Sequence, residues 1–152
     1  MMAIFHTMAI TIASLASCAL AQDPACLVNG GFISTCAFPG LRFNETSLGM
    51  YCLNDMIHTY GYNWTWIDLD TCLTNNDGQL TPMTNGSYSG SCANCTVTFN
   101  STVHIACDCE NVAGQVAPTS IDLNSIVYNV DGTMGCCEQF GNKTWKGPQA
   151  LT

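Results

Sequence analysis

The sequence has few positive charges and no cluster of them. Of its 152 residues only three are Lys or Arg, against 11 that are Asp or Glu, which gives a net charge of −8. Proteins that bind nucleic acids gather cations to neutralise phosphates. Arg42, Lys143 and Lys146 do not form such a cluster. The composition therefore excludes nucleic acid as a partner.

Long runs of charge are also absent, and this bears on folding. Charged residues make up 9% of the chain, whereas hydrophobic residues make up 47%. Disordered chains have the opposite balance, with high charge and little apolar content. The length suits one compact domain or two very small ones, since domains typically have ~100–200 residues.

Hydrophobic runs long enough to span a membrane are missing. The run over residues 8–21 is shorter than the ~20 apolar residues that a spanning helix needs. It ends in Ala19-Leu20-Ala21, the small-x-small pattern that signal peptidase accepts. We expect residues 1–21 to be a signal peptide cleaved before Gln22, and the product to be secreted and extracellular, with no membrane span.

Catalytic motifs are lacking as well. The sequence contains no nucleophile elbow, metal triad or phosphate loop. A glycosidase needs two carboxylates held ~5–10 Å apart, and no spacing among the acidic residues favours one pair. His58 and His104 have no neighbouring nucleophile or ligand, so surface or strand positions are expected. We expect no enzymatic activity and no cofactor.

Cysteines, in contrast, are abundant. Without Cys18, which lies in the expected signal peptide, ten remain, and an even count in a small secreted chain predicts disulfides. The segment over residues 92–109 has the pattern C-x₂-C-x₁₁-C-x-C, which could offer four thiolates to zinc. However, C-x-C is a poor second arm and oxidising compartments rarely keep zinc thiolates. Disulfides are therefore favoured and no metal is expected.

Six N-x-S/T triplets agree with secretion, because such triplets matter only where a chain meets the glycosylation machinery. Glycosylation is predicted at Asn44, Asn63, Asn85, Asn94, Asn100 and Asn142.

An internal repeat organises the remaining chain. The segment Ile67-Asp68-Leu69-Asp70 is followed by Asn75-Asn76-Asp77-Gly78, and the same order returns 54 residues later as Ile121-Asp122-Leu123-Asn124 and Asn129-Val130-Asp131-Gly132. Each copy follows a pair of cysteines, Cys36 and Cys52 in the first and Cys92 and Cys109 in the second. A duplicated unit explains the shared order and spacing.

Each unit has the pattern of β structure. Strands are expected over residues 32–36, 47–53, 96–99 and 102–107, with a tight connection over 99–102 that makes the last two a hairpin. Asp77-Gly78 and Asp131-Gly132 are type I′ turn signals. The Ile-Asp-Leu segments predict short 3₁₀ turns, which Asp68 and Asp122 would cap.

One such unit is too small to bury a sufficient core, but two packed together and joined by disulfides are not. We therefore predict one pseudo-symmetric all-β domain. The expected organisation is a lead over residues 22–30, a domain over 31–135 with repeats at about 31–84 and 85–135, and a tail over 136–152.

The doubled pattern closely resembles the cyanovirin-N homology family. Residues 120–126 (SIDLNSI) with residues 129–132 (NVDG) match its signature nearly verbatim, and both repeats are covered. The resemblance implies a disulfide-stapled fold in which each repeat is a three-stranded sheet plus a β-hairpin that packs on the other repeat's sheet. It also implies a lectin for mannose-type oligosaccharides, without catalysis, with a sugar site at each end.

The family register also implies disulfide pairs. A Leu-like residue precedes the second cysteine by four positions, as Leu48 precedes Cys52. Ile105 has the same relation to Cys109, which implies the bridge Cys92–Cys109, with Cys95–Cys107 nested inside it. Cys26, Cys72, Cys136 and Cys137 leave three connectivities open. The adjacent pair is expected to bridge outward rather than to itself.

Two sets of carbohydrate-binding residues follow from the resemblance by position. The first site would combine Thr74, Asn75, Asn76 and Asp77 with Ser87, Ser91, Glu110 and Asn111. The second would combine Asn129, Val130 and Asp131 with Ser34, Thr35, Asn54 and Asp55. Turn chemistry alone is an equally good explanation of the Asp and Asn residues at the two turns. Trp64, Trp66 and Trp145 could stack on sugars or pack in the core.

The sequence departs from the family at four positions. Members that bind tightly often carry basic or long amide side chains where this chain has Gly31, Leu53, Glu110 and Gly114, and Asn85 lies beside the first site. The alternative function is therefore a secreted, disulfide-rich structural or interaction protein that keeps the fold without binding sugar. The expected partners are oligosaccharides or glycoproteins, with a monomer or a hairpin-exchanged dimer as the assembly.

Overall fold

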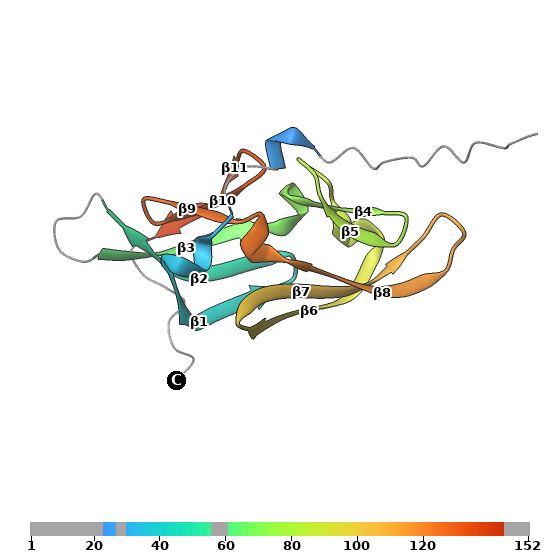
Figure 1. Ribbon diagram of the computed structural model, residues 1–152, viewed down its shortest axis with the longest axis horizontal. Coiled ribbons are helices and arrows are strands. Elements are labelled where there is room, and N and C mark those ends of the chain that lie inside the picture. The colour runs from blue at the N-terminus through green and yellow to red at the C-terminus, as the bar shows by residue number, and fades with distance from the viewer. Residues whose placement is uncertain (1–22, 27–29, 56–60, 145–152) are drawn as a thin grey trace, which may run out of the picture.

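The protein is built mainly from β-strands. The computed structural model describes residues 23–26, 30–55 and 61–144. Within these ranges the regular structure consists of strands and short 3₁₀ helices, in an elongated arrangement of small sheets (Figure 1). The all-β class predicted from the sequence is confirmed.

The first repeat forms a sheet followed by a hairpin. Its elements are η2 (Phe32–Ser34), β1 (Cys36–Asn44), β2 (Ser47–Asn54), β3 (Gly61–Asp68), η3 (Leu69–Thr71), β4 (Leu73–Asn76) and β5 (Gln79–Pro82). Strands β1, β2 and β3 pair antiparallel in sequence order, and β4 pairs with β5.

The second repeat has the same order of elements. They are η4 (Tyr88–Gly90), β6 (Cys92–Asn100), β7 (Thr102–Glu110), β8 (Val116–Asp122), η5 (Leu123–Ser125), β9 (Tyr128–Val130) and β10 (Thr133–Cys136). Strands β6, β7 and β8 form a three-stranded sheet, and β9 pairs with β10. The predicted repeat of a three-stranded sheet plus a hairpin is therefore confirmed.

The chain after the second repeat adds strands that the sequence did not predict. β11 (Gln139–Phe140) pairs with β10, and β12 (Asn142–Thr144) pairs with β3. The first sheet therefore has four strands. A short helix, η1 (Pro24–Cys26), precedes the first repeat.

One predicted strand is wrong. The segment expected to be extended over residues 32–36 forms η2, and the strand begins at Cys36. Gly31, with φ of 98°, starts the turn, and the N–H of Ser34 donates to the Gly31 carbonyl over 3.1 Å. Phe32 is fully buried. The Phe32 N–H donates to the Val127 carbonyl over 3.2 Å, so this segment is held by the second repeat instead of by a neighbouring strand.

The predicted turns and caps are present. Asp77 and Gly78 have φ of 50° and 83°, and Asp131 and Gly132 have φ of 49° and 79°. Two successive positive φ values define a type I′ turn. At both 3₁₀ helices an Asp caps the first turn: the Asp70 N–H donates to the Asp68 carboxylate over 3.1 Å, and the equivalent bond of Asp122 measures 2.8 Å.

Each hairpin packs on the sheet of the other repeat. Figure 1 shows β4 and β5 lying over β8, and β9 and β10 lying over β2 and β3. Two equivalent hydrogen bonds hold these contacts. The Leu80 N–H donates to Thr119 Oγ1 over 3.1 Å, and the Met134 N–H donates to Thr65 Oγ1 over 3.0 Å. The packing of each hairpin on the sheet of the other repeat, which the family resemblance implied, is confirmed.

The hydrophobic core is shared by the two repeats. Side chains at matching positions fill it, and each of the following is fully buried or nearly so: Leu48, Ile67, Leu69, Leu73, Val103, Ile105, Leu123, Val127 and Met134. Neither unit has such a core alone, because each inner sheet face is covered by the other unit's hairpin.

Five disulfides staple the fold. Cys36–Cys52, Cys92–Cys109 and Cys95–Cys107 link neighbouring strands, in the pairing that the sequence analysis expected. The segment weighed as a zinc site thus holds two disulfides. Cys26–Cys137 and Cys72–Cys136 resolve the open connectivity. The adjacent cysteines bridge outward, one to the N-terminal segment and one to the first repeat.

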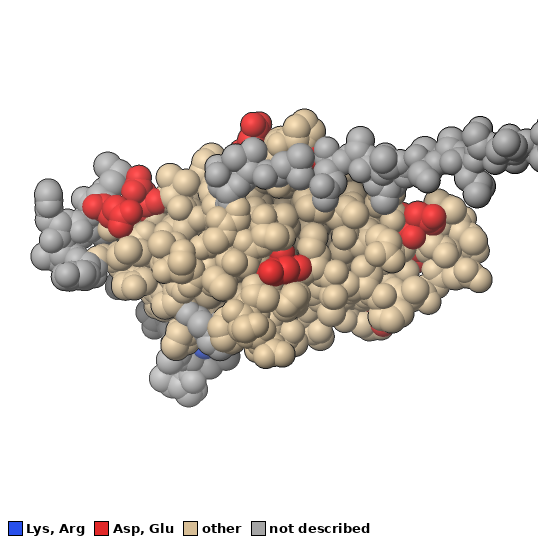
Figure 2. All heavy atoms as spheres, viewed as in Figure 1, with Lys and Arg blue, Asp and Glu red and all other residues tan. Residues whose placement is uncertain are grey.

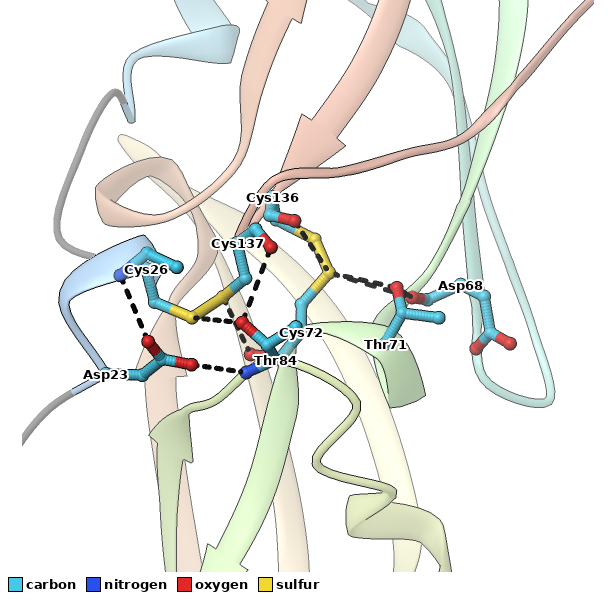
Figure 3. The surroundings of a disulfide bond; sticks show 9 residues. Asp23, Cys26, Asp68, Thr71, Cys72, Thr84, Cys136 and Cys137 are labelled. Carbon is cyan, nitrogen blue, oxygen red and sulfur yellow. Dashed lines mark hydrogen bonds between the residues drawn. A yellow bond between two sulfur atoms is a disulfide. The ribbon is translucent and has the colours of Figure 1, made fainter.

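The region around these last two bridges also anchors the N-terminal segment (Figure 3). The Asp23 carboxylate accepts hydrogen bonds from the N–H groups of Ala25, over 3.0 Å, and Thr84, over 3.1 Å. Hydrogen bonding to Thr84 is the main reason that the pKa of Asp23 lies below its ordinary value. The segment is therefore held both covalently and by a carboxylate.

Several other residues considered in the sequence can be placed in the fold. Trp64 is buried, in edge-to-face contact with Tyr51 and Trp66 at centroid distances of 4.8 and 5.5 Å. His104 lies in β7. Trp145 and His58 lie outside the described residues.

Among the described residues, no helix has the length and apolar content needed to cross a membrane.

The predicted glycosylation at Asn63 conflicts with the fold. Asn63 is 0% exposed, and its Nδ2 is enclosed without a hydrogen-bond partner in the described part of the chain. Strand alternation turns this residue inward opposite Cys52, whereas an N-x-S/T triplet is defined by residue order alone. The other five asparagines of such triplets are exposed: Asn44, Asn85, Asn94, Asn100 and Asn142.

Candidate functional site

The first candidate site is built around Asn75, near the end of β4. Its Nδ2 donates to Ser91 Oγ over 2.8 Å and to the Glu110 carbonyl over 2.7 Å, while its Oδ1 accepts from the Gly78 N–H over 2.7 Å. One side chain therefore closes the hairpin turn and ties it to the second sheet. Asn75 positions the site, and its donors are already used.

Asp77, at the turn itself, reaches across to the loop between β7 and β8. Its Oδ1 accepts from the Val112 N–H over 2.9 Å. The loop is shaped by Asn111, whose Oδ1 accepts from the N–H groups of Ala113 and Gln115 over 3.0 and 2.9 Å. The turn approaches closely, since a Cβ added to Gly78 would lie 3.3 Å from that of Asn111.

A shallow depression of about 260 Å³ lies between the turn and the loop. Its lining comes from both repeats: Asn75, Asp77, Ser91, Glu110, Asn111 and Val112. Five of these were predicted from the sequence. Val112 was missed, because its part depends on a loop whose counterpart in the first repeat has a different length and sequence.

The remaining residues predicted for the first site do not line this depression. Thr74 and Asn76 are half-buried in β4, and Ser87 is exposed at the start of η4. Ser87 follows Gly86, which packs against Leu73 and Thr74.

The second candidate site repeats the same construction. Asn129 Nδ2 donates to Thr35 Oγ1 over 3.1 Å and to the Leu53 carbonyl over 3.0 Å, while its Oδ1 accepts from the Gly132 N–H over 3.0 Å. Asn129 therefore fixes its turn on the first sheet as Asn75 fixes the other turn on the second.

Other residues predicted for the second site have different environments. Asn54 is only 6% exposed and donates to Asn63 Oδ1 over 2.6 Å, so its amide supports the turn instead of facing solvent. Asp55, Val130 and Ser34 are exposed. Lys143, from β12, donates to the Asp131 carbonyl over 3.0 Å and adds a cation that the sequence analysis did not place here.

The surface carries mainly negative charge. Figure 2 shows acidic side chains at both ends of the elongated molecule and almost no basic ones on this face. No group of three or more His, Cys, Asp or Glu side chains within residues 23–26, 30–55 and 61–144 could hold a metal ion. Carboxylates beside hydroxyl and amide groups can accept hydrogen bonds from neutral polar ligands, and charge-assisted bonds are the stronger ones.

Comparison with known proteins assigns the chain to a family. The CVNH domain profile matches residues 32–135, which is more than half of the chain. The protein belongs to the CVNH, or cyanovirin-N homology, family. Among curated proteins no sequence match is found.

Solved structures share the fold at low sequence identity. The NMR structure of GzCVNH from Gibberella zeae aligns with a TM-score of 0.61 and 19% identity, over 70% of this chain and 96% of that one. A microvirin:mannobiose complex aligns at 0.58 and 22%, over 71% and 99%. A MoCVNH3 variant in complex with (N-GlcNAc)4 aligns at 0.62 and 13%, over 71% and 97%.

Proposed function

We propose that this protein is a secreted carbohydrate-binding protein, a lectin without catalytic activity, whose ligands are mannose-type oligosaccharides. Family membership supports the lectin assignment, and the microvirin neighbour, solved with mannobiose, supports the choice of sugar. The proposed sites are the two turn regions built on Asn75 and Asn129.

The observation that carries the proposal is the position of Asp77. Its carboxylate lies at the rim of an open depression, and its Oδ2 has no hydrogen-bond partner among the described residues. Ser91 Oγ and the Glu110 carboxylate line the same depression. A saccharide offers adjacent hydroxyl groups, which such acceptors bind in pairs.

Secretion rests on different support. Residues 1–21 have the pattern of a signal peptide. Five disulfides in a small domain suit an oxidising compartment. Detection of a mature chain that begins at Gln22 in culture medium would test this part of the proposal.

The binding proposal is tested by calorimetric titration with mannobiose and larger oligomannosides. We expect Asp77→Ala and Asp131→Ala each to abolish one class of sites, and the double variant to abolish binding. Thr98→Ala, which changes an exposed residue in the body of β6, serves as the control. Equal binding by the double variant and the unaltered protein would remove both proposed sites.

The alternative, a structural or interaction protein with the same fold, has one observation in its favour. Val112, which lines the first site, is 91% exposed and apolar. It offers no hydrogen bond to a saccharide, and an exposed apolar side chain can equally contact a protein partner. A folded product with all five disulfides formed and no signal on a broad glycan array would favour this alternative.

A further inference from the structure

The outer faces of the two sheets differ although the folds match. In the first sheet Tyr51 pairs in register with Trp64, and Gly49 pairs with Trp66. The three aromatic rings pack edge to face, and a Cβ on Gly49 would lie 2.7 Å from both indoles. This outer face is filled by its own side chains.

In the second sheet the same four positions carry small or acidic residues. Asp108 pairs with Pro118 where the first sheet has Tyr51 and Trp64, and Ala106 pairs with Ser120 where it has Gly49 and Trp66. The loss of two indoles and a phenol leaves this face open. It is also the sheet beside the first candidate site, since Glu110 continues β7 into that site.

A second depression, of about 330 Å³, lies on this open side of the molecule. It shares Ser91 and Glu110 with the first site and extends to Asn94, Asp108 and Val116. Because two lining residues are common to both, the depressions lie next to each other. A site for a single small ligand typically occupies ~300–1,000 Å³, so neither depression alone would hold more than a small saccharide.

A third depression, of about 370 Å³, continues beyond the second around the edge strand β6. The two share Ser89, Cys92, Ala93 and Asn94, and the third reaches Glu45 and Phe43 in the first repeat. Tyr88 also lines it.

Tyr88 forms part of the base of this third depression. Tyr88 is 1% exposed, and its hydroxyl has no hydrogen-bond partner among the described residues. Burial raises the pKa of Tyr88, and the charges of Asp70 and Asp68 raise it further.

We propose that the first site is the end of a longer groove across the second sheet, and that the groove binds successive residues of one extended oligosaccharide chain. The groove comprises the three depressions: the first site, the part over Asp108 and Val116, and the part that ends at Tyr88. This inference rests on the proposed lectin function and deepens it, because it makes the ligand an oligosaccharide chain longer than a disaccharide.

The chemistry along the groove suits a saccharide chain. Asp108 Oδ2 accepts from Asn94 Nδ2 over 3.0 Å, which fixes a carboxylate on the open face. Val116 is 65% exposed and offers an apolar surface to the non-polar face of a pyranose ring. This part of the groove therefore offers a saccharide both an acceptor and an apolar contact.

The test compares linear α-linked mannose chains of two and five residues by calorimetry. The protein carries Asp131→Ala, so that only the first site binds, and is made without N-glycosylation, so that Asn94 is bare. We expect at least tenfold tighter binding of the pentasaccharide, and Asp108→Ala or Val116→Arg should lower its affinity to that of the disaccharide. Both residues lie at the surface, and the two substitutions are chemically unrelated. An effect that they share therefore reports on the groove and not on misfolding of one variant. Thr98→Ala, on the same strand as Asn94 but outside the groove, should bind both chains as before.

The possible results distinguish a failure of the proposed groove from a failure of the proposed lectin function. Equal affinity for both chain lengths in the protein with a bare Asn94 would overturn the groove and leave the lectin assignment intact. A length preference that survives both substitutions would also overturn it. Absence of binding to either chain, or to any glycan on an array, would overturn the lectin function, and the groove with it.

Discussion

Replacement of Asn75 or Asn129 by Ala should lower the free energy of unfolding, because each change weakens the contact between the two repeats. Each side chain makes three hydrogen bonds: two join its hairpin to the other repeat, and the third closes its own turn. A typical protein hydrogen bond contributes about 0.5–1.5 kcal/mol net. Three such bonds, two of them to groups that water can also reach, give an expected loss of about 2–3 kcal/mol for each substitution.

The assay is urea unfolding with the disulfides intact, followed by tryptophan fluorescence and by circular dichroism. Asn76→Ala is the matched control, because Asn76 is a half-buried asparagine on the same strand and donates no hydrogen bond from its side chain among the described residues. We expect the control to lose no more than about 0.5 kcal/mol, as surface substitutions do.

The same variants have a functional signature. Asn75→Ala should weaken sugar binding at the first site only, since the Asp77 turn loses its anchor on the second sheet. Asn129→Ala should do the same at the second site. If either variant were as stable as the Asn76→Ala control, the role assigned to these amides would be refuted.

Three further predictions follow from the core, the bridges and the N-terminal segment. Leu69→Ala and Leu123→Ala, which empty equivalent buried positions, should each cost about 2–5 kcal/mol in urea unfolding. The paired change Cys72→Ser with Cys136→Ser should cost about 4 kcal/mol, because this bridge closes a separation of 64 residues, and thermal unfolding would reveal it. Folding lowers the pKa of Asp23 below its ordinary 3.8, so its contribution is complete above that value and is lost as pH falls through the folded-state pKa. The stabilities of the unaltered protein and Asp23→Asn should therefore differ at neutral pH and converge as the pH falls below the folded-state pKa of Asp23.

Much of the fold could be predicted because it is encoded locally and twice. Asp77-Gly78 and Asp131-Gly132 define type I′ turns through backbone preference alone, and the caps at Asp68 and Asp122 need only their own neighbours. The repeat also predicts the topology, because two copies of one sequence pattern indicate two copies of one structure.

The features that sequence reasoning missed depend on tertiary context. Phe32 lies in a 3₁₀ turn whose backbone is hydrogen-bonded to Asn124 and Val127 of the second repeat, contacts that the local sequence does not reveal. The burial of Asn63 and Asn54 follows from strand register, which a triplet or a family position does not reveal. The short strand β12 has too few residues to show a pattern of its own, and pairing with β3 creates it.

The candidate sites were predictable in part for the same reason. Asn75 and Asn129 follow from the repeat, as do the turns beside them. Val112 comes from a loop whose counterpart in the first repeat differs in length and sequence, and Lys143 comes from a segment after the second repeat, so symmetry could not indicate either. The open outer face of the second sheet depends on pairs such as Asp108 with Pro118, which become neighbours only across paired strands.

The most direct test of the central claim is a ¹⁵N NMR titration of the mature chain with mannobiose. If polar turn regions at the two ends bind sugar, amide shifts should be confined to residues 75–78, 91 and 110–112, and to residues 129–132 with their neighbours on the first sheet. An unchanged spectrum at saturating sugar, or shifts confined to other surfaces, would contradict the account.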